Sequence, residues 1–376
     1  MSEELGGLKT MANIIDYVKE WGKYSFLERP LNEADNLILC QLAYLHYEGF
    51  VPDLRKRSVP VSIRSIYEDP DRDRILKDYW YRDNNKELFE LAALSERFGS
   101  MKMDFYVNII DESEEMQFSA ITYILGDKSV YMAFRGTDAT IVGWKEDLNM
   151  AFSKPLRSQQ LAAVYMDKAA SYVSGDFYAG GHSKGGNLAV YAAMNCSERA
   201  RGRILRVFSN DGPGFRPEIR EQGNFEEIAD RVSKFIPRSS LVGMILEDHS
   251  EYEIVESRAI GMLQHNTYTW KIEEGSFVRA RNMTGAKILR DTALNEWILS
   301  LPEEEIHAFV DTLYEVVSAS EASNVFEFGA DWKRCLQHVV KAARGVDDAT
   351  RKTIQKMLRS LFEILLENMK QGGNRD

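Results

Sequence analysis

The sequence predicts an α/β protein in which a mostly parallel β-sheet is flanked by helices and an added all-helical region follows at the C-terminus. Three observations support this class. Between about residues 104 and 257, short apolar segments typical of strands alternate with helical segments, the pattern of a parallel sheet covered on both faces. A glycine-rich turn near Ser183 joins a strand-like segment to a helix-like one. From about residue 286 onward, no strand pattern remains.

The first hundred residues are predicted to be mainly helical. Apolar residues recur at helical spacing over residues 14–21, and a second helix is expected over about 33–47. Residues 51–75 are charged and contain three prolines, which predicts a loop. A third helix over 87–98 is expected to end at Gly99, because glycine commonly follows the last turn of a helix.

The middle of the chain carries the strand pattern. The segments predicted as strands are 104–110, 117–125, 129–134, 176–180, 204–209, 232–236 and 252–257. The segments predicted as helices between them are 144–150, 156–173 and 188–194, and residues 218–229 are expected to contain another helix. Gly126 and Asp127 are expected to make the turn that connects the second strand to the third.

The pattern after residue 286 is helical throughout. Apolar residues recur at helical spacing in four stretches, which are 288–298, 306–317, 339–343 and 354–366. Apolar stripes need a surface to bury against, so we expect this tail to pack on the core, partly covering the site or forming a contact in a homo-oligomer. The expected division is an N-terminal helical segment that packs on the core (1–100), the α/β core (101–285) and a C-terminal helical region (286–376).

The glycine-rich turn around Ser183 has the form expected of a catalytic nucleophile. It contains Gly181-His182-Ser183-Lys184-Gly185, follows the strand 176–180 and opens the helix 188–194. A G-x-S-x-G turn between strand and helix is the nucleophile elbow, which holds its serine in strained geometry with the hydroxyl exposed. Gly181 and Gly185 would leave room for the helix to pass close to the strand. An ordinary glycine-rich turn in a βαβ unit is the alternative.

A serine nucleophile needs a base, and on this architecture the base follows the serine in the chain. The histidines that come after Ser183 are His249, His265, His307 and His338. The last two lie in the helical tail, His249 lies in a charged loop, and His182 on the elbow is expected to point elsewhere. We therefore predict that His265, which follows the last strand after a short loop, is the base.

Two segments are expected to supply the oxyanion hole. One backbone N–H normally comes from the residue after the nucleophile, here Lys184. The second donor comes from a loop after an earlier strand, and Phe134-Arg135-Gly136-Thr137 ends a strand in that place. Thr137 could give both its N–H and its hydroxyl. The alternative is a strand-end turn in which Arg135 and Asp138 form a surface ion pair.

These segments resemble the lipase class 3 family of α/β-hydrolases. The family pattern F-R-G-[ST], a following Trp and Asp-Leu, and G-H-S-L-G-G is similar to 134–137, Trp144 with 147–148, and 181–186, where Lys184 replaces the leucine. The resemblance covers roughly residues 100–270. It implies an α/β-hydrolase fold and a Ser-His-Asp triad that cleaves an ester through an acyl-enzyme.

The chain also resembles a bacterial group of uncharacterised lipase-like proteins. Members of that group have Asp-Gly-Pro-Gly-Phe after the elbow, here residues 211–215, and a Gln-His segment near a Trp, here residues 264–270. No cofactor is implied by either resemblance. The helical tail has no counterpart in the lipases.

Asp211 is predicted to be the acid that orients the histidine. It follows the strand 204–209, the first after the elbow helix, and a carboxylate at that strand end can reach the histidine. In the class 3 lipases the acid usually comes later, and the comparable place here, residues 239–243, has no carboxylate. A turn-capping aspartate is the alternative for Asp211, and Asp248 and Glu247 are the other candidate acids.

The composition argues against several other classes of protein. Lys and Arg number 47 against 58 Asp and Glu, so the net charge is −11, which argues against nucleic acid or an anionic membrane surface as the main partner. The N-terminus lacks the features of a signal peptide, and no apolar run is long enough to span a membrane. Three widely separated cysteines show no metal-ligand spacing, so we expect free thiols, a cytoplasmic location and no metal.

Two hypotheses about function remain. In the leading one the protein is a serine esterase or lipase-like hydrolase in which Ser183 attacks, His265 transfers the proton and Asp211 orients His265. Its substrate would be a small-molecule ester or lipid. In the other, the chain is a catalytically silent hydrolase scaffold that acts as a binding or regulatory protein, with the helical tail as its contact element.

Overall fold

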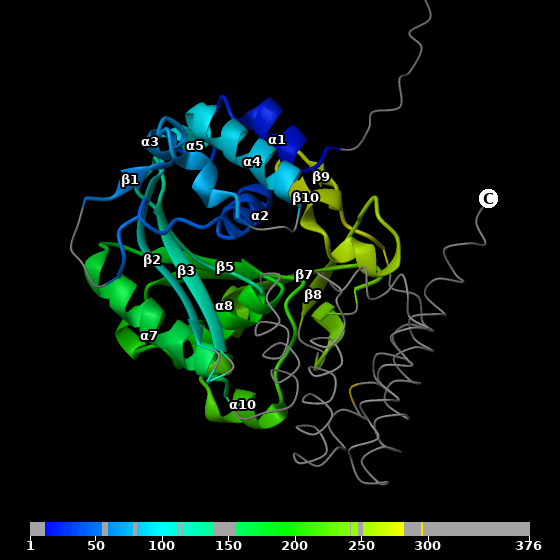
Figure 1. The fold of residues 1–376 in the computed structure, drawn as a ribbon. Helices are drawn as coiled ribbons and strands as arrows, with labels where there is room; N and C mark the ends of the chain where they lie inside the picture. The colour runs from blue at the N-terminus through cyan, green and yellow to red at the C-terminus, as the bar shows by residue number, and fades with distance from the viewer. Residues whose placement is uncertain are drawn as a thin grey trace, which may run out of the picture.

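The computed structural model describes residues 12–54, 59–77, 81–111, 113–114, 116–137, 155–240, 242–246, 251–281 and 295. In this part of the chain, an eight-stranded sheet runs through the centre and helices cover both of its faces (Figure 1). Five consecutive strands of the sheet run parallel to one another. The predicted α/β class with a mostly parallel, helix-flanked sheet is therefore confirmed.

The strands lie in the sheet in the same order as in the chain. They are β1 (Val61–Ser62), β2 (Lys102–Asp111), β3 (Met116–Ile124), β4 (Val130–Phe134), β5 (Phe177–His182), β6 (Ile204–Asn210), β7 (Val232–Pro237) and β8 (Tyr252–Val255). The first four pair antiparallel, and β4 to β8 pair parallel. Parallel strands bring their carboxyl ends to one edge of the sheet, so the loops that follow β4 to β7 gather there.

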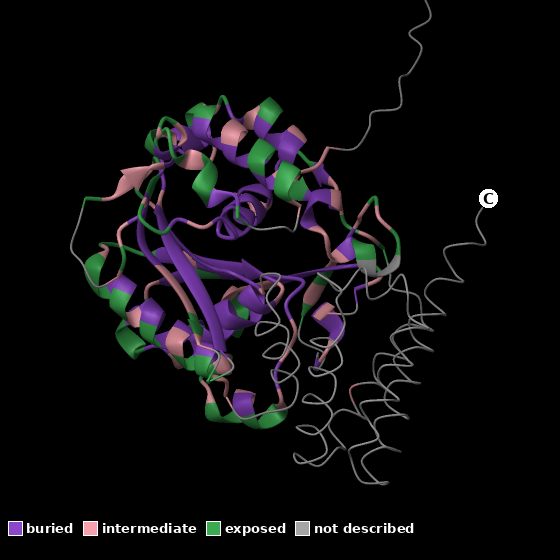
Figure 2. Ribbon diagram, in the orientation of Figure 1, coloured by how far each residue is buried: buried purple, intermediate pink, exposed green. Residues whose placement is uncertain are grey.

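The two faces of the sheet carry separate apolar cores, because successive side chains of a strand point to opposite faces. In β4, Val130, Met132 and Phe134 belong to one core, whereas Tyr131 and Ala133 belong to the other. Figure 2 shows that the central strands of the sheet are mostly buried, whereas its outer strands are partly exposed, and that the helices expose their outer sides. Strands buried on both faces explain the continuous apolar segments in the sequence.

Two groups of helices cover these faces. The N-terminal layer consists of α1 (Ile14–Trp21), α2 (Glu33–Leu42), α3 (Ile63–Tyr67), α4 (Arg82–Leu94) and α5 (Glu96–Gly99). The elbow layer consists of α7 (Arg157–Tyr172), α8 (Lys184–Asn195), α9 (Glu198–Arg201) and α10 (Pro217–Gln222). The two layers lie on opposite sides of the sheet in Figure 1.

Polar contacts fix the N-terminal layer internally. Asn13 and Asn32 cap α1 and α2, each in a capping box that satisfies the exposed N–H groups of the first turn. Arg97 of α5 forms a fully buried ion pair with Asp35 of α2, and Tyr17 of α1 donates to the same carboxylate at 3.1 Å. Arg97 also donates to backbone carbonyls of the segment between α1 and α2, so its guanidinium is satisfied without water.

The structure differs from the sequence-based expectation in four places. Residues 51–75 are not all loop, because they contain β1, α3 and a short 3₁₀ turn. The helix expected over 87–98 is divided at Ser95, whose side chain caps α5. The second helix, expected over about 33–47, ends at Leu42. A hairpin of β9 (Ile272–Glu273) and β10 (Ser276–Phe277) was not predicted at all.

Some expectations lie outside the described residues. They include the helix at 144–150 and all helices of the tail. The division of the chain at residues 100 and 285 stays a prediction, and its third part, 286–376, lies outside the described residues apart from Asn295.

Candidate active site

Ser183 stands at a sharp turn between β5 and α8. Its backbone has φ 58° and ψ −132°, a conformation that non-glycine residues rarely adopt. The strain is held in place by the surrounding structure, since the Ser183 N–H donates to the carbonyl of Asn210 at 3.0 Å and the Ser183 carbonyl accepts from Gly186. The turn is thus the strained strand-to-helix turn that the motif predicted.

Glycine is required on both sides of this turn. A Cβ on Gly185 would lie 2.1 Å from the carbonyl oxygen of Phe134, and a Cβ on Gly181 would lie 2.1 Å from the backbone of Gly185. Both contacts are with backbone, which cannot move aside as a flexible side chain could. Helix α8 therefore meets β4 and β5 at backbone distance, and this approach fixes Ser183 at the sheet edge.

The structure brings His265 and Asp211 together. His265 ends the 3₁₀ turn Gly261–His265, and its Nδ1 lies 2.6 Å from Oδ2 of Asp211. The Asp211 side chain is completely buried, whereas the His265 side chain is 31% exposed. Burial alone would raise the pKa of Asp211, but the hydrogen bond and charge of His265, with a hydrogen bond from Ser240, hold that pKa below its ordinary value. Asp211 is therefore an ionised acceptor at neutral pH.

Contacts from three elements hold Asp211 in place. It directly follows β6, has φ 53°, and donates its N–H to the carbonyl of Phe235 at 2.7 Å. Its other carboxylate oxygen, Oδ1, accepts hydrogen bonds from the Ser240 hydroxyl and from the N–H of Gly243. A Cβ on Gly243 would lie 2.4 Å from this oxygen, so only glycine allows that approach.

The elbow helix also holds the loop after Asp211. The Asn187 amide of α8 donates to the carbonyls of Pro213 and Gly214 at 3.2 and 2.9 Å. Gln159 of α7 donates in turn to the Asn187 amide oxygen at 2.8 Å. The nucleophile turn and the acid loop are thereby joined on one rigid support.

His265 lies beside the elbow. Its ring contacts the ring of His182, the residue before Ser183, with a centroid separation of 4.5 Å. Because Nδ1 of His265 is occupied by Asp211, Nε2 is the nitrogen left for exchange with Ser183. Within the described part of the chain, the Ser183 hydroxyl and the His265 ring are not joined by a direct hydrogen bond, and such bonds often tighten only when substrate binds.

The two candidate oxyanion donors flank Ser183. A Cβ on Gly136 would lie 3.3 Å from the Ser183 Cβ, so the loop after β4 passes beside the nucleophile and Thr137 comes next in that loop. Lys184 is the first residue of α8, where backbone N–H groups have no partner within the helix. The Lys184 side chain is buried and its ammonium donates to the Gln117 carbonyl at 3.2 Å, so it points toward β3 and not into solvent beside the hydroxyl.

The loop that carries His265 is anchored to the N-terminal layer. The Thr267 hydroxyl donates to Gln41 of α2 at 2.8 Å, and the Tyr268 hydroxyl donates to Asn85 of α4 at 2.6 Å. Gln264 accepts from the N–H of Ser239 through its side chain. Its backbone carbonyl accepts from the indole N–H of the buried Trp270 at 2.8 Å. The base is therefore supported by residues from three distant parts of the chain.

The sequence did not reveal the roles of two residues near this site. Ser240, which bonds Asp211, lies in the segment where the class 3 lipases have their acid, and this place was a signal that could have identified it. His182 was considered only as a base. Its Nδ1 shares a hydrogen bond with the Tyr44 hydroxyl and its Nε2 donates to the backbone carbonyl of His265, and no local pattern indicated those partners. The fallback acids, Glu247 and Asp248, lie outside the described residues.

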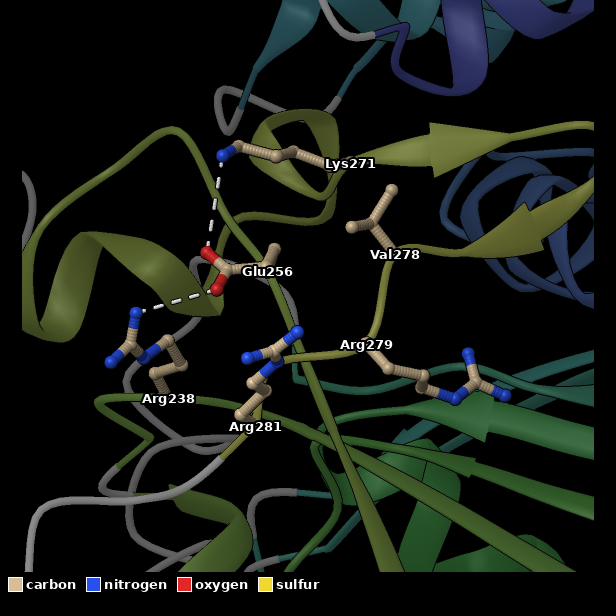
Figure 3. A pocket seen from close by; sticks show the side chains of 6 residues that line it. All are labelled: Arg238, Glu256, Lys271, Val278, Arg279 and Arg281. Carbon is tan, nitrogen blue, oxygen red and sulfur yellow. Dashed lines mark hydrogen bonds and ion pairs between the residues drawn. The ribbon is translucent and has the colours of Figure 1, made fainter.

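A charged cavity of about 500 Å³ lies elsewhere, lined by Arg238, Glu256, Lys271, Val278, Arg279 and Arg281 (Figure 3). Glu256 accepts from Arg238 at 3.3 Å and lies 3.9 Å from the Lys271 ammonium. Arg279 pairs with Glu33 and Glu253 on adjoining elements. Of the described cations in the lining, only Arg238 and Lys271 pair with its acid, Glu256. Neither Ser183 nor His265 lines the cavity, so we do not assign it to the reaction.

The described residues contain no group of three or more His, Cys, Asp or Glu side chains arranged to hold a metal ion. None of the helices within these same ranges has both the length and the apolar character that a bilayer crossing requires.

The mostly parallel sheet, the helices on both faces and the strained elbow define an α/β-hydrolase fold of the lipase-like type. The family model described as Mbeg1-like matches residues 92–315, more than half of the chain, and the protein belongs to this lipase-like family. The matched part contains the elbow, Asp211 and His265 but not α1 or α2. The relation to a bacterial group stays a prediction.

Comparison with curated protein sequences finds no match. Among solved structures, the crystal structure of M37 lipase is similar with 12% sequence identity and a TM-score of 0.36. The alignment covers 69% of this chain and 79% of that chain. A similarity at this level does not identify site residues.

Proposed function

We propose that the protein is a serine hydrolase that cleaves carboxylic esters, with a lipid or other acyl ester as substrate, through Ser183, His265 and Asp211. The observation that carries the proposal is the 2.6 Å contact between His265 and the buried, ionised Asp211 directly beside the strained Ser183 turn. A histidine with a purely structural role would not need this arrangement, in which one ring nitrogen contacts a buried carboxylate and the other is left free beside the serine of the elbow.

Each residue of this group has a defined role in the proposed reaction. Asp211 accepts a hydrogen bond from the Nδ1–H of His265, which keeps the proton on Nδ1 and leaves Nε2 unprotonated. Nε2 can then take the Ser183 proton as Oγ attacks the ester carbonyl. The imidazolium that forms is stabilised by the carboxylate and then donates its proton to the leaving alcohol. In the second half of the reaction, Nε2 takes a proton from water as the water oxygen attacks the acyl carbon. The bond from that carbon to Oγ then breaks, the acid is released, and the imidazolium returns its proton to Oγ of Ser183.

The negative charge of the tetrahedral intermediate would be stabilised at the start of α8 and at the loop after β4. The N–H of Lys184 and the N–H and hydroxyl of Thr137 are the proposed donors. The positive end of the α8 dipole lies at the same place and favours the same charge. Removal of one such donor typically costs a factor of about 10²–10³ in kcat.

The Mbeg1-like match supports a lipase-like substrate class, while the ester itself is part of the proposal. Cys40 and Cys196 are buried free thiols, which supports the expected reducing, cytoplasmic compartment. A homo-oligomeric contact through the tail remains a prediction from its apolar stripes.

Labelling with a fluorophosphonate probe tests the proposal. Wild-type protein should be labelled, and Ser183→Ala should lose the label and lower kcat for short p-nitrophenyl esters by about 10⁴–10⁶. Ser171→Ala, on the exposed side of α7, is the matched control and should behave as wild type. Folded wild-type protein that takes no label would favour the silent scaffold, and ester hydrolysis retained by Ser183→Ala would contradict the assignment.

A further inference from the structure

His182 is a buried titratable residue that the proposed reaction does not use. Its side chain lies between the N-terminal layer and the loop of the base, and both of its ring nitrogens have partners. Nδ1 lies 3.0 Å from the hydroxyl of Tyr44, and Nε2 lies 3.0 Å from the backbone carbonyl of His265. A polar ring fixed at both ends in an apolar setting needs an explanation beyond packing.

The partners determine which ring nitrogen carries the proton. A carbonyl oxygen can only accept, so Nε2 of His182 must carry the proton and donate to His265. Nδ1 is then an acceptor, and the Tyr44 hydroxyl donates to it. The backbone carbonyl of His182 is 3.5 Å from that hydroxyl, farther than Nδ1 at 3.0 Å.

His182 keeps this form across the physiological range. Burial, and to a smaller extent the charge of His265, lower the pKa of His182 to about 3. The ring therefore stays neutral while the neighbouring His265 gains and loses its proton. A neutral ring can remain in contact with a base that cycles, because it does not release or accept the proton itself.

The site is shaped to admit Tyr44. Tyr44 follows α2 in the N-terminal layer, and a Cβ on Gly136 would lie 2.3 Å from its hydroxyl. Glycine at residue 136 therefore leaves the space in which Tyr44 meets His182, right beside the Ser183 Cβ. Tyr44 lies outside the residues that match the family, 92–315, so the contact links the N-terminal helices of this chain to the family's elbow.

We propose that His182 and Tyr44 are positioning residues that hold the backbone carbonyl, and through it the imidazole, of His265 in line between Asp211 and Ser183. The catalytic effect of this positioning rests on the proposed function, whereas the contacts among the residues do not. His265 ends a 3₁₀ turn and is partly exposed, so local structure alone holds it weakly. The Nε2–H bond fixes the backbone, and the ring contact at 4.5 Å limits rotation of the imidazole.

Misplacement of a catalytic group by about 1 Å can cost a factor of about 10² in rate. His182→Leu, which removes the donor, should lower kcat about 10- to 100-fold with KM within about twofold. His182→Gln keeps an N–H donor at the distance of Nε2 and should stay within about threefold of wild type. Tyr44→Phe frees Nδ1 and should lower kcat about fivefold, the effect of one lost hydrogen bond.

The matched controls separate positioning from general damage. The shorter amide of His182→Asn reaches the position of Nδ1 but not that of Nε2, so the bond to the His265 carbonyl is lost. His182→Asn should therefore resemble His182→Leu and not His182→Gln. Tyr178→Phe on β5 tests the loss of a tyrosine hydroxyl away from the site and should leave kcat unchanged. Thermal unfolding of every variant reports folding, and a lower kcat that follows the fall in Tm across all variants would overturn the proposal.

Nitrogen-15 NMR of the histidine rings tests the proposed hydrogen bonds and does not depend on catalytic activity. Wild-type His182 should show the neutral Nε2–H form from pH 5 to pH 8, and the Nδ1 proton of His265 should give a downfield signal. That signal should shift or broaden in His182→Leu and Tyr44→Phe and return in His182→Gln. Detection of His182 in the Nδ1–H form, or an unchanged His265 signal in His182→Leu, would overturn the proposal even if the protein proves to be no hydrolase.

Discussion

The two helical layers support the site by different physical means. The elbow layer meets the sheet through backbone contacts at Gly181 and Gly185, and it fixes Ser183. The N-terminal layer supports the base through hydrogen bonds between polar side chains. Gln41 contacts Thr267, Tyr44 contacts His182, and Asn85 contacts Tyr268. Close backbone packing tolerates no added atom, whereas a hydrogen-bond network tolerates replacements that keep the same donors and acceptors.

A change on the elbow side should therefore have the largest effect. In Gly185→Ala the new Cβ would lie 2.1 Å from the Phe134 carbonyl oxygen and 2.9 Å from the Arg135 backbone. We expect a loss of more than about 4 kcal/mol in unfolding free energy, which would leave little folded protein. Gly202→Ala is the control, because its nearest atom lies at 3.4 Å, and urea denaturation should give a change within about 1 kcal/mol. Equal stability of the two variants would remove the proposed contrast between the layers.

Asp211 joins the two layers, because it follows β6 next to the elbow and bonds the base. Asp211→Asn should lower kcat by about 10²–10⁴. An amide can donate to Nδ1 of His265, which leaves the proton on Nε2, so Nε2 cannot take the proton of Ser183. Asparagine tolerates the left-handed backbone at this residue, so the fold should be kept. Steady-state kinetics of Asp211→Asn and Asp248→Asn check this, with little effect expected for the latter. The reverse result would assign the acid to the later loop.

His182 should make the N-terminal contact sensitive to acid. Its folded pKa is about 3, because burial and then the charge of His265 lower it, whereas the unfolded value is about 6.5. Between these values the unfolded chain binds a proton that the folded chain does not, so stability falls as pH falls through this window. Wild type should lose about 1.4 kcal/mol per pH unit more than His182→Gln between pH 6 and pH 4.

Urea denaturation of both proteins at several pH values from pH 7 down to pH 4 measures this difference. Above pH 7 the two stability curves should run parallel, because His182 is neutral in both states there. Parallel curves at pH 5 as well would mean that His182 takes up its proton in the folded protein and that its burial does not hold the ring neutral.

Local patterns in the sequence predicted much of the fold and the elbow. Ser183 stands between two contiguous segments, a strand and a helix, and its glycines belong to the same ten residues. Asp211 and His265 were predicted from their places after particular strands, and the structure puts them 2.6 Å apart. Their roles in catalysis, like those of Thr137 and Lys184, remain to be tested by the variants above.

The supporting contacts could not be predicted, because they depend on how distant segments meet. Tyr44 and His182 are 138 residues apart, and Ser240 reaches Asp211 across 29 residues. The β9–β10 hairpin has strands of two residues each, too short for a periodic pattern. Besides Phe277 of β10, Ile272 pairs with Ala12 near the start of the described chain. In residues 51–75, the prolines and charged residues predicted a loop, and the short strand β1 and the one-turn helix α3 were therefore missed.

The order of the strands in the sheet bears on when the candidate active site forms during folding. Neighbouring strands are neighbours in the chain, so the sheet can grow by closing loops that are much shorter than those between the base loop and the N-terminal layer. Thr267 contacts Gln41 across 226 residues, and Tyr268 contacts Asn13 across 255. Closing longer loops costs more entropy, and distant contacts tend to form late in folding. During refolding from urea, we expect the far-ultraviolet circular dichroism signal to return before reactivity toward a fluorophosphonate. Equal rates for the two signals would show that the base loop docks together with the sheet.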